Sequence, residues 1–317
     1  MNAAVVNVLG QSPRYLPFPE PDPGTGEVLI HVRAAGLHPV VKSIAGGAHY
    51  ISGGQLPMIP GIDGIGIRDD DGSRVYFGFA RRPFGTMSER TVAPSARCLP
   101  IPEGLDDAVA AAIPNPGMSA WLSLKERAGL ARGETVLVSG ASGVAGRMAV
   151  QAARHLGAKR VIGTGRDVDS LRVAALDATI RLDQPEDEIR KALTAEVEQG
   201  IDVIIDYLWG RPTELILEAL AKNFRPDRAR AVRMVEIGDS AGKTITLPGA
   251  TLRSVDLKLF GSGFGSVSVD RVWDAIPNLF SLAAKGELTI DIERIPLRSV
   301  ESAWTRKTEG RRIVFVP

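Results

Sequence analysis

The sequence predicts an α/β protein in which a parallel sheet with crossover helices follows a mainly β domain. From residue 135 onward, apolar β-rich runs alternate with helical patterns, the order that builds a parallel sheet. Before about residue 97, short strand candidates are separated by turns and by loops rich in proline and glycine. A glycine-rich turn at residues 140–146 joins a strand to a helix, as in dinucleotide-binding units.

Composition is that of an ordinary soluble globular protein, and the length is sufficient for two domains. The chain has 317 residues, 44% of them hydrophobic and 24% charged, and its net charge is +1. This charge gives no reason to expect a nucleic-acid or membrane partner. The single cysteine, Cys98, excludes an internal disulfide framework. The N-terminal residues lack a signal pattern and no run approaches membrane-spanning length, so we expect a cytoplasmic protein.

The first domain is predicted from strands that are short and bounded by turns. The candidate strands span residues 3–8, 27–34, 62–67, 74–77 and 88–92. A short helix at 105–112 is followed by the sequence Pro-Asn-Pro-Gly at 114–117, which we expect to form a stiff connector. A helix over 118–128 then leads to the second domain.

The second domain shows the strand-and-helix alternation most clearly. Predicted strands span 135–138, 160–163, 179–182, 203–207, 233–237 and 255–260, with helices over 148–158, 171–176, 186–198, 213–221 and 269–284. The tail returns to strand character at 288–295 and 313–316, which predicts that it rejoins the first domain. A basic segment at 225–230 is expected to be an exposed loop.

Three glycines, Gly140, Gly143 and Gly146, follow the first strand of this alternation. They allow a tight turn and a close approach of the backbone to a pyrophosphate, whose charge the N-terminus of the following helix stabilises. Their GxxGxxG spacing departs from GxGxxG, so the alternative is a plain strand-to-helix turn without a ligand.

The end of the next strand indicates which dinucleotide is bound. An acidic residue at this position binds the ribose 2′-hydroxyl of NAD, whereas an arginine accommodates the 2′-phosphate of NADP. Arg166 comes first, after Gly165, and Asp167 follows it. We therefore predict NADP(H). The alternative is that Arg166 is merely solvated and that Asp167 caps a helix beginning near Val168.

The combined motifs resemble the medium-chain dehydrogenase/reductase superfamily, most closely its zinc-independent quinone oxidoreductase branch. The resemblance covers nearly the whole chain and is carried by GEVLIHVRAAGLHPVVKSIAGG, LPMIPGIDGIG, GTMSERTVAP, LPIPEGLDDAVAAAIPNPGMSAW, GETVLVSGASGVAG and VIGTGRD. It implies a GroES-like catalytic domain at 1–117 and a Rossmann NADP(H)-binding domain at 118–265. Residues 266–317 would return to the catalytic domain.

Two departures from the zinc-dependent members predict that no catalytic zinc is bound. Those enzymes have a Cys just after the AAG turn and a His-Glu pair in a GHE motif. Here Leu37 follows Ala35-Gly36, and the later motif is Gly61-Ile62-Asp63. Neither Leu37 nor Ile62 can ligate a metal. Without this Lewis acid, hydride delivery to a quinone or enone is easier than reduction of a simple carbonyl, because the charge delocalises onto a distant oxygen.

Two residues are the candidate proton donors. The resemblance places an Asn of a GxNPxD segment and a later Tyr near the nicotinamide. His38 replaces that Asn, Val41 replaces the Asp, and Tyr50 stands at the Tyr position. Either His38 or Tyr50 can donate a proton or hydrogen bond to a developing enolate. The alternatives are a structural or exposed histidine and a tyrosine packed in the wall between the domains.

The remaining candidate residues are cofactor contacts. Met118 and Trp209 have packing roles in the core as alternatives. The candidates follow from the resemblance or from their place at strand ends, which face the ligand in an open parallel sheet. The full set is Asn115, Met118, Ser119, Gly140, Ser142, Gly143, Val144, Ala145, Gly165, Arg166, Tyr207, Trp209, Ile237, Gly238, Phe260, Gly261 and Ser262.

We therefore expect an NADPH-dependent oxidoreductase that transfers hydride to a quinone or an α,β-unsaturated carbonyl without zinc. One alternative is an alkenal or enone reductase rather than a quinone reductase. Another is an alcohol or aldehyde dehydrogenase with a different metal arrangement, and a third is an NADPH-binding structural or regulatory protein without turnover. The family resemblance also implies a homodimer, formed through the apolar edge strand at 255–260.

Overall fold

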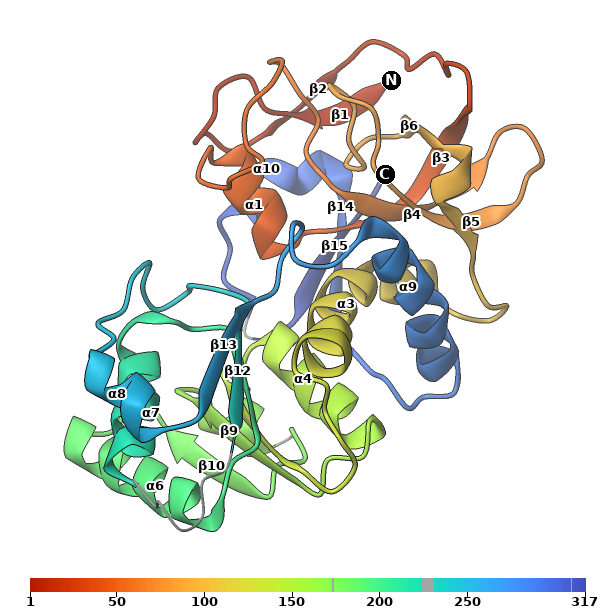
Figure 1. The fold of residues 1–317 in the computed structure, drawn as a ribbon. Helices are drawn as coiled ribbons and strands as arrows, with labels where there is room; N and C mark the ends of the chain where they lie inside the picture. Colours follow the sequence, from red (N-terminus) through yellow and green to blue (C-terminus); the bar gives the residue numbers. More distant parts are fainter. Residues whose placement is uncertain (173, 224–230, 309) are drawn as a thin grey trace. The chain divides into compact units, whose positions relative to one another are not determined.

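The computed structural model describes residues 1–172, 174–223, 231–308 and 310–317, and its chain divides into two compact units (Figure 1). The first unit consists of Met1–Asn115 and Pro277–Pro317, and the second of Pro116–Ile276. The second unit ends at Ile276, within the long helix α9 (Val269–Ala284). The basic segment predicted at 225–230 lies outside the described residues.

A mixed sheet of seven strands among the described residues forms the framework of the first unit. Its long central strand β3 (Glu27–Gly36) pairs with β4, β6 and β15. Val28, Ile30 and Val32 alternate along β3 and are buried, as expected for a strand with one face on a core. The other strands are β4 (Asp63–Arg68), β5 (Arg74–Gly78), β6 (Arg90–Pro94), β7 (Cys98–Pro100), β14 (Ile292–Pro296) and β15 (Arg312–Val316).

The C-terminal tail adds two of these strands. Strand β15 pairs antiparallel with β3, with Val314 opposite Gly36 and Phe315 opposite Ala35, and β14 pairs parallel with β15. The return of the tail to the N-terminal unit follows the sequence-based expectation. The C-terminal segment is therefore joined to β3 through backbone hydrogen bonds.

The remaining elements of the first unit pack around this sheet. A separate hairpin-like pair, β1 (Asn2–Val5) and β2 (Arg14–Pro17), contributes to a core with residues of β3, α1 and the C-terminal segment. The sequence patterns did not predict β2, β7, α1 or α10. The helical elements are α1 (Pro39–Ala45), η1 (Ser95–Arg97), α2 (Asp107–Ala112), η4 (Leu297–Ser299) and α10 (Val300–Trp304).

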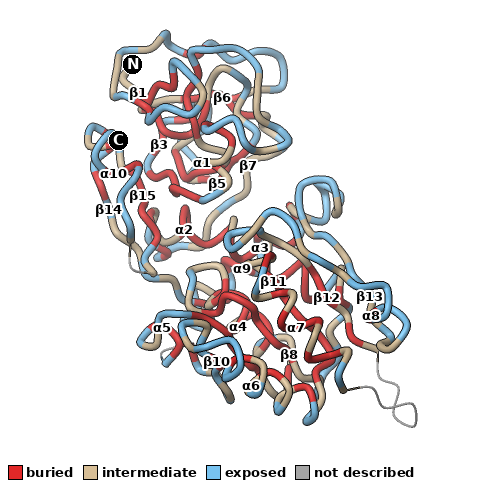
Figure 2. Tube along the Cα trace, turned by 90° about the vertical axis from the view of Figure 1, so that its left-hand side faces the viewer, coloured by how far each residue is buried: buried red, intermediate tan, exposed pale blue. Residues whose placement is uncertain are grey.

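The second unit has a six-stranded parallel sheet in the order β10-β9-β8-β11-β12-β13, as far as the described residues show. Strands β8 and β11 lie at its centre and are almost entirely buried (Figure 2). Their bounds, with those of the other four, are β8 (Thr135–Ser139), β9 (Arg160–Gly165), β10 (Ala178–Arg181), β11 (Val203–Asp206), β12 (Val232–Glu236) and β13 (Leu257–Gly261).

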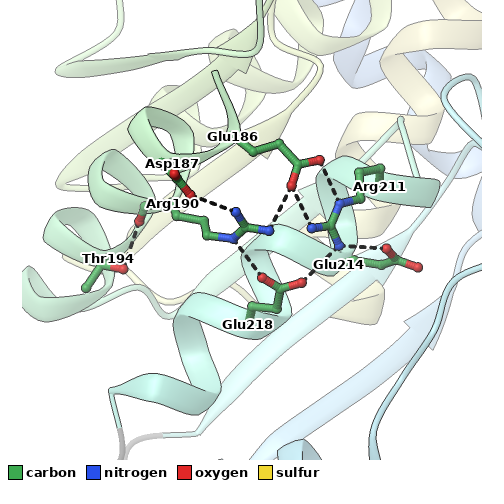
Figure 3. Close-up of polar contacts among 7 residues, drawn as sticks. All are labelled: Glu186, Asp187, Arg190, Thr194, Arg211, Glu214 and Glu218. Carbon is green, nitrogen blue, oxygen red and sulfur yellow. Dashed lines mark hydrogen bonds and ion pairs between the residues drawn. The ribbon is translucent and has the colours of Figure 1, made fainter. Parts of the chain in front are cut away.

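Helices cover the sheet of the second unit. Side chains of α6 and α7 form one hydrophobic core with Leu137, Ile162 and Ile204 of the central strands. On the exposed side, Arg190 and Arg211 connect these two helices by ion pairs to Glu186 and Glu218 (Figure 3). The helices are α3 (Pro114–Leu122), the π-helical turn η2 (Ser123–Arg127), α4 (Val144–His155), α5 (Val168–Arg172), α6 (Glu186–Gln199), α7 (Gly210–Lys222), α8 (Gly249–Ser254) and α9.

The prediction of a stiff connector at 114–117 was wrong. Pro114, Asn115, Pro116 and Gly117 form the first turn of α3. Prolines are compatible with this position because the first amides of a helix have no intrahelical acceptor in any case. The helix therefore begins four residues earlier than the apolar periodicity indicates.

Candidate active site

The glycine-rich turn begins at the carboxyl end of β8. Gly140 has φ +90°, a conformation that a side chain disfavours. The amides of Gly140 and Ala141 both donate to the carbonyl of Thr164, at 3.1 and 2.8 Å. The turn is therefore tied to the end of the neighbouring strand β9.

Gly146 and Gly143 lack side chains for different reasons. A Cβ at Gly146 would lie 2.1 Å from the Gly140 carbonyl oxygen and 2.7 Å from the Ala141 Cα, so Gly146 is needed for helix α4 to pack on the turn. A Cβ at Gly143 would meet only the Gly140 oxygen, at 3.5 Å, and its φ of −78° suits any residue. Packing of the described residues therefore does not explain why residue 143 is a glycine. A ligand that approaches the backbone closely at this position would explain it.

The amides that follow Gly143 are suited to an anion. Val144 and Ala145 lie in the first turn of α4, where backbone N–H groups have no intrahelical acceptor. The positive end of the helix dipole adds to their attraction for a phosphate. Ser142 precedes them. A Cβ on Gly165 would lie 2.6 Å from the Ser142 hydroxyl oxygen, so the end of β9 lies close to this side chain. The geometry of residues 140–146 thus fits the pyrophosphate of a dinucleotide.

Arg166 and Asp167 lie directly after β9 but differ in their surroundings. Both oxygens of the Asp167 carboxylate accept hydrogen bonds, from the amides of Asp169 and Ser170 at 3.1 Å and from the Ser170 hydroxyl at 2.8 Å. Asp167 therefore caps α5, as one of the sequence-based alternatives proposed. Arg166 is exposed and forms no hydrogen bond or ion pair with any residue that the structure describes.

The loop after β11 is organised by a residue that the sequence analysis did not single out. Asp206 is fully buried, and its carboxylate accepts hydrogen bonds from the amides of Leu208 and Trp209, at 3.0 and 3.2 Å, and from the Thr213 hydroxyl. It thereby fixes the loop that begins at Tyr207. The available signal was an acidic residue at the end of an apolar strand, followed by a threonine near the start of a helix.

Tyr207 and Trp209 occupy different positions in this loop. Burial raises the pKa of the Tyr207 phenol above its ordinary value, and Ser119 opposes this shift. The Cβ of Tyr207 lies 3.5 Å from the Cβ position on Gly140, so this residue borders the glycine turn. Trp209 packs on the hydrophobic core beside α6 and α7, which favours its role as a core aromatic residue.

Further strand ends lie along the same edge of the sheet. Registers place Ser139 opposite Thr164 and Asp206, and Glu236 opposite Asp206 and Gly261. Ile237 and Gly238 follow β12, Phe260 and Gly261 end β13, and Ser262 comes next. The predicted cofactor contacts at strand ends therefore all lie on the side of the sheet where its parallel strands have their carboxyl ends.

The Phe260 ring already has a protein partner at this edge. The Arg127 guanidinium lies 5.5 Å from the ring centroid, and its Nε donates to the Gly261 carbonyl oxygen at 3.0 Å. In contrast, apart from its chain neighbours, no residue in the described part of the chain has an atom within 4 Å of the Cβ position on Gly261. The open backbone at Gly261 is thus the stronger candidate for ligand contact.

Three predicted contacts belong to α3. Asn115 is the last residue of the first unit's N-terminal segment, whereas Met118 and Ser119 belong to the second unit. Met118 and Ser119 are not fully buried, so Met118 is not simply a core residue. The Ser119 hydroxyl donates to the carbonyl oxygen of Pro116 at 2.9 Å. A role for these residues in cofactor binding stays a prediction.

In the first unit, His38 belongs to a buried polar cluster. Its Nε2 lies 3.4 Å from Asp63 Oδ1, while the Tyr76 hydroxyl donates to Asp63 Oδ2 at 3.0 Å. Arg312 donates from Nη1 to the Leu37 carbonyl oxygen at 2.9 Å. Burial lowers the pKa of His38 more than Asp63 raises it, and burial lowers the pKa of Arg312 to about 10. This placement favours the structural alternative for His38.

Tyr50, the other predicted proton donor, is in the opposite situation. The residue is 69% exposed, and its ring stacks on His49 with centroids 4.1 Å apart. Arg82 holds the same loop by donating to the carbonyl oxygens of Ile51 and Gly53. The structure thus brings Tyr50 to a surface of the first unit, whereas His38 is fully buried in the same unit.

Among the described residues, no group of three or more His, Cys, Asp or Glu side chains could hold a metal ion. The positions that supply zinc ligands in the zinc-dependent members carry the apolar residues Leu37 and Ile62. Likewise, none of the helices in the described ranges has the length and apolar character needed to cross a membrane.

Comparison with known proteins places the chain in a family. It is 34% identical over 248 residues to a quinone oxidoreductase of Lama guanicoe, with 74% of each chain covered. It is 29% identical, over the full length of both chains, to a probable NADPH-dependent quinone reductase of Emericella nidulans. Searching family models gave no match.

The architecture agrees with a solved structure of the same kind. The quinone oxidoreductase of Thermus thermophilus, whose complex with NADPH was also solved, superimposes with a TM-score of 0.80 at 26% identity, with both chains fully covered. A Rossmann-type parallel sheet with a mainly β unit defines a medium-chain dehydrogenase/reductase. Within that superfamily, the chain belongs to the zinc-independent quinone oxidoreductase branch, and the predicted family and fold class are confirmed.

Proposed function

We propose that this protein is an NADPH-dependent oxidoreductase that reduces a quinone or an α,β-unsaturated carbonyl compound without zinc. The observation that carries the proposal is the turn at Gly143, where backbone amides and an unfilled Cβ position suit a pyrophosphate. Membership of the quinone oxidoreductase branch supports the same reaction. The Emericella nidulans relative, a probable NADPH-dependent quinone reductase, supports NADPH as the cofactor.

The residues of the second unit account for cofactor binding. Amides of Val144 and Ala145 bind the pyrophosphate, and Arg166 pairs with the 2′-phosphate, since no described residue competes for its charge. Gly261 leaves its backbone open to the ring end of the cofactor. When bound, NADPH supplies the hydride.

The side chains of the first unit restrict the substrate. Leu37 and Ile62 cannot hold a metal that would polarise an isolated carbonyl. The substrate must therefore stabilise its own negative charge by conjugation, as quinones and enones do. Tyr50 is the proposed proton donor because it is exposed, whereas His38 is buried beside Asp63 at the start of β4.

The test is oxidation of NADPH, with NADH in parallel, against a naphthoquinone, a 2-alkenal, an aryl enone and a saturated aldehyde. We expect turnover of the quinone or the enones with NADPH, and their ratio distinguishes a quinone reductase from an enone reductase. Turnover of the saturated aldehyde alone would contradict the proposal, and metal analysis of the same preparation would then identify the ion. Tight NADPH binding without any turnover would favour the regulatory alternative.

The role of Tyr50 has its own test. General acid catalysis contributes a hundredfold or more to a rate, so Tyr50→Phe should lower turnover by about that factor if Tyr50 is the donor. Tyr15→Phe, which removes a hydroxyl from β2 of the same unit, is the matched control and should leave turnover unchanged. A loss of less than about threefold for Tyr50→Phe combined with His38→Ala would reject an acid role for both.

A homodimer formed through β13 is also proposed. Strand β13 is the edge of the parallel sheet, and Leu259 on it is 39% exposed. An exposed apolar edge strand favours pairing with a second copy. Leu259→Lys should therefore give a monomer in light scattering, whereas Leu252→Lys, on the exposed surface of α8, should not. A cytoplasmic location stays a prediction from the sequence.

A further inference from the structure

The acidic residue next to Arg166 is already engaged in local structure. In NAD-binding proteins an acid at the end of the second strand binds the ribose hydroxyls. Here, however, the Asp167 carboxylate accepts three hydrogen bonds from Asp169 and Ser170. Turning it toward a ribose would remove the N-terminal cap of α5, which contributes about 1 kcal/mol to helix stability. Asp167 is thus poorly placed to select NAD(H).

A second cation lies beside the same segment. Arg147 belongs to the first turns of α4, where its amide donates to the Gly143 carbonyl oxygen at 2.9 Å. Hydrogen bonds from Ser170 and Asp169 lower the pKa of Asp167, and the nearby Arg147 guanidinium contributes to this shift. Arg147 is half-buried rather than fully solvated.

The backbone brings these groups together. The end of β9 is tied to the glycine turn by the two hydrogen bonds that the Thr164 carbonyl accepts. Gly165 approaches Ser142 so closely that a Cβ on Gly165 would overlap its hydroxyl. Arg166 therefore follows the strand to which the glycine turn is tied, and Arg147 lies in the helix that begins at this turn, near enough for its charge to act on Asp167.

We propose that Arg147 is a second specificity-determining residue, which acts with Arg166 to select the 2′-phosphate of NADPH. The inference rests on the proposed function, because it names a charge that this cofactor site uses. A 2′-phosphate carries close to two negative charges, which a single exposed arginine only partly balances. The two guanidinium groups together match this charge, and Arg147 in addition offsets the negative charge of Asp167.

The experiment measures dissociation constants of the intact protein for NADPH, NADH and adenosine 2′,5′-bisphosphate. Arg147→Met keeps a long helix-forming side chain and removes only the charge. We expect it to weaken binding of NADPH and of the bisphosphate by about tenfold or more, with less than a threefold change for NADH. Arg147→Lys should restore most of the affinity.

Two control variants complete the design. Arg172→Met removes an exposed arginine from the neighbouring helix α5 and should change none of the constants more than twofold, because Arg172 pairs only weakly with Asp169 at 3.5 Å. Asp167→Asn preserves a capping side chain and should strengthen NADPH binding by a few fold. A tenfold loss of NADH affinity in Asp167→Asn would show that Asp167 binds the ribose, which would overturn the inference.

The outcomes separate this inference from the proposed function. If the unmodified protein does not prefer the bisphosphate to adenosine 5′-monophosphate, the NADPH assignment itself fails. If it has that preference and Arg147→Met leaves it unchanged, only the role of Arg147 is refuted. An equal loss for NADPH and NADH would also refute it, because that result indicates a general disturbance of α4.

Discussion

Alanine at Gly143 and at Gly146 should separate ligand binding from folding. At Gly146, the new Cβ would lie 2.1 and 2.7 Å from backbone atoms of Gly140 and Ala141, so the helix must move. Such overpacking costs about 1–3 kcal/mol, which corresponds to a Tm lower by roughly 2–12 °C for a unit of the size of Pro116–Ile276. At Gly143 the nearest atom is 3.5 Å away and φ is −78°, so stability should change by less than about 1 kcal/mol.

Gly143→Ala, which should hardly change stability, should nevertheless weaken the binding of NADPH. A methyl group on Gly143 would occupy the space next to the α4 amides, so Gly143→Ala should weaken NADPH binding by at least about tenfold, or ~1.4 kcal/mol. The assay is a fluorescence titration with NADPH, combined with thermal unfolding in its absence. Unchanged NADPH affinity in a stable Gly143→Ala protein would refute a pyrophosphate at this position. A lower Tm for Gly143→Ala than for Gly146→Ala would refute the packing argument.

Three further predictions concern stability. Tyr76→Phe leaves the buried Asp63 carboxylate without its 3.0 Å donor, and should lower the free energy of unfolding by about 1–3 kcal/mol in urea titrations. Burial lowers the pKa of His38 in the folded protein, so the unfolded chain binds a proton at His38 more readily than the folded chain does. The folded state is therefore not penalised by His38 above about pH 6.5, and its free energy of unfolding decreases as the pH falls below that value. Tm measured from pH 8 to pH 5 should therefore fall less steeply in His38→Gln, and an equal slope would contradict this. Arg211→Ala removes exposed ion pairs and should shift Tm by less than about 3 °C, with the difference vanishing in 1 M salt (Figure 3).

Local patterns predicted the second unit well because its strands and helices are long and regular. Helix α9 has the bounds that its apolar periodicity indicated, and each predicted strand overlaps one of β8 to β13. The glycine turn was recognisable because backbone geometry itself demands glycine at Gly140 and Gly146. Such requirements act over a few residues and are visible in one short segment.

Contacts between distant parts of the chain could not be predicted in this way. His38 was interpreted as a candidate proton donor from its place in the family motif. Its burial beside Asp63 could not be predicted, because Asp63 and Arg312 are distant in sequence and the sheet brings them together. The same holds for Arg147, whose relation to Asp167 requires that α4 and β9 be adjacent. Asp167 itself illustrates a local competition, since a carboxylate can cap a helix or bind a ribose and the sequence alone leaves both open.

The pairing of β15 with β3 constrains the order in which the chain can fold during synthesis. Residues 116–276 form a continuous segment with their own sheet, so this unit can fold as soon as it leaves the ribosome. The first unit, although synthesised earlier, lacks β14, β15 and the buried Arg312 contact to Leu37 until the end of the chain emerges. Its central strand β3 then remains partly unpaired throughout translation. The nucleotide-binding unit can therefore complete its sheet before the first unit does, since the first unit needs segments from both sides of it.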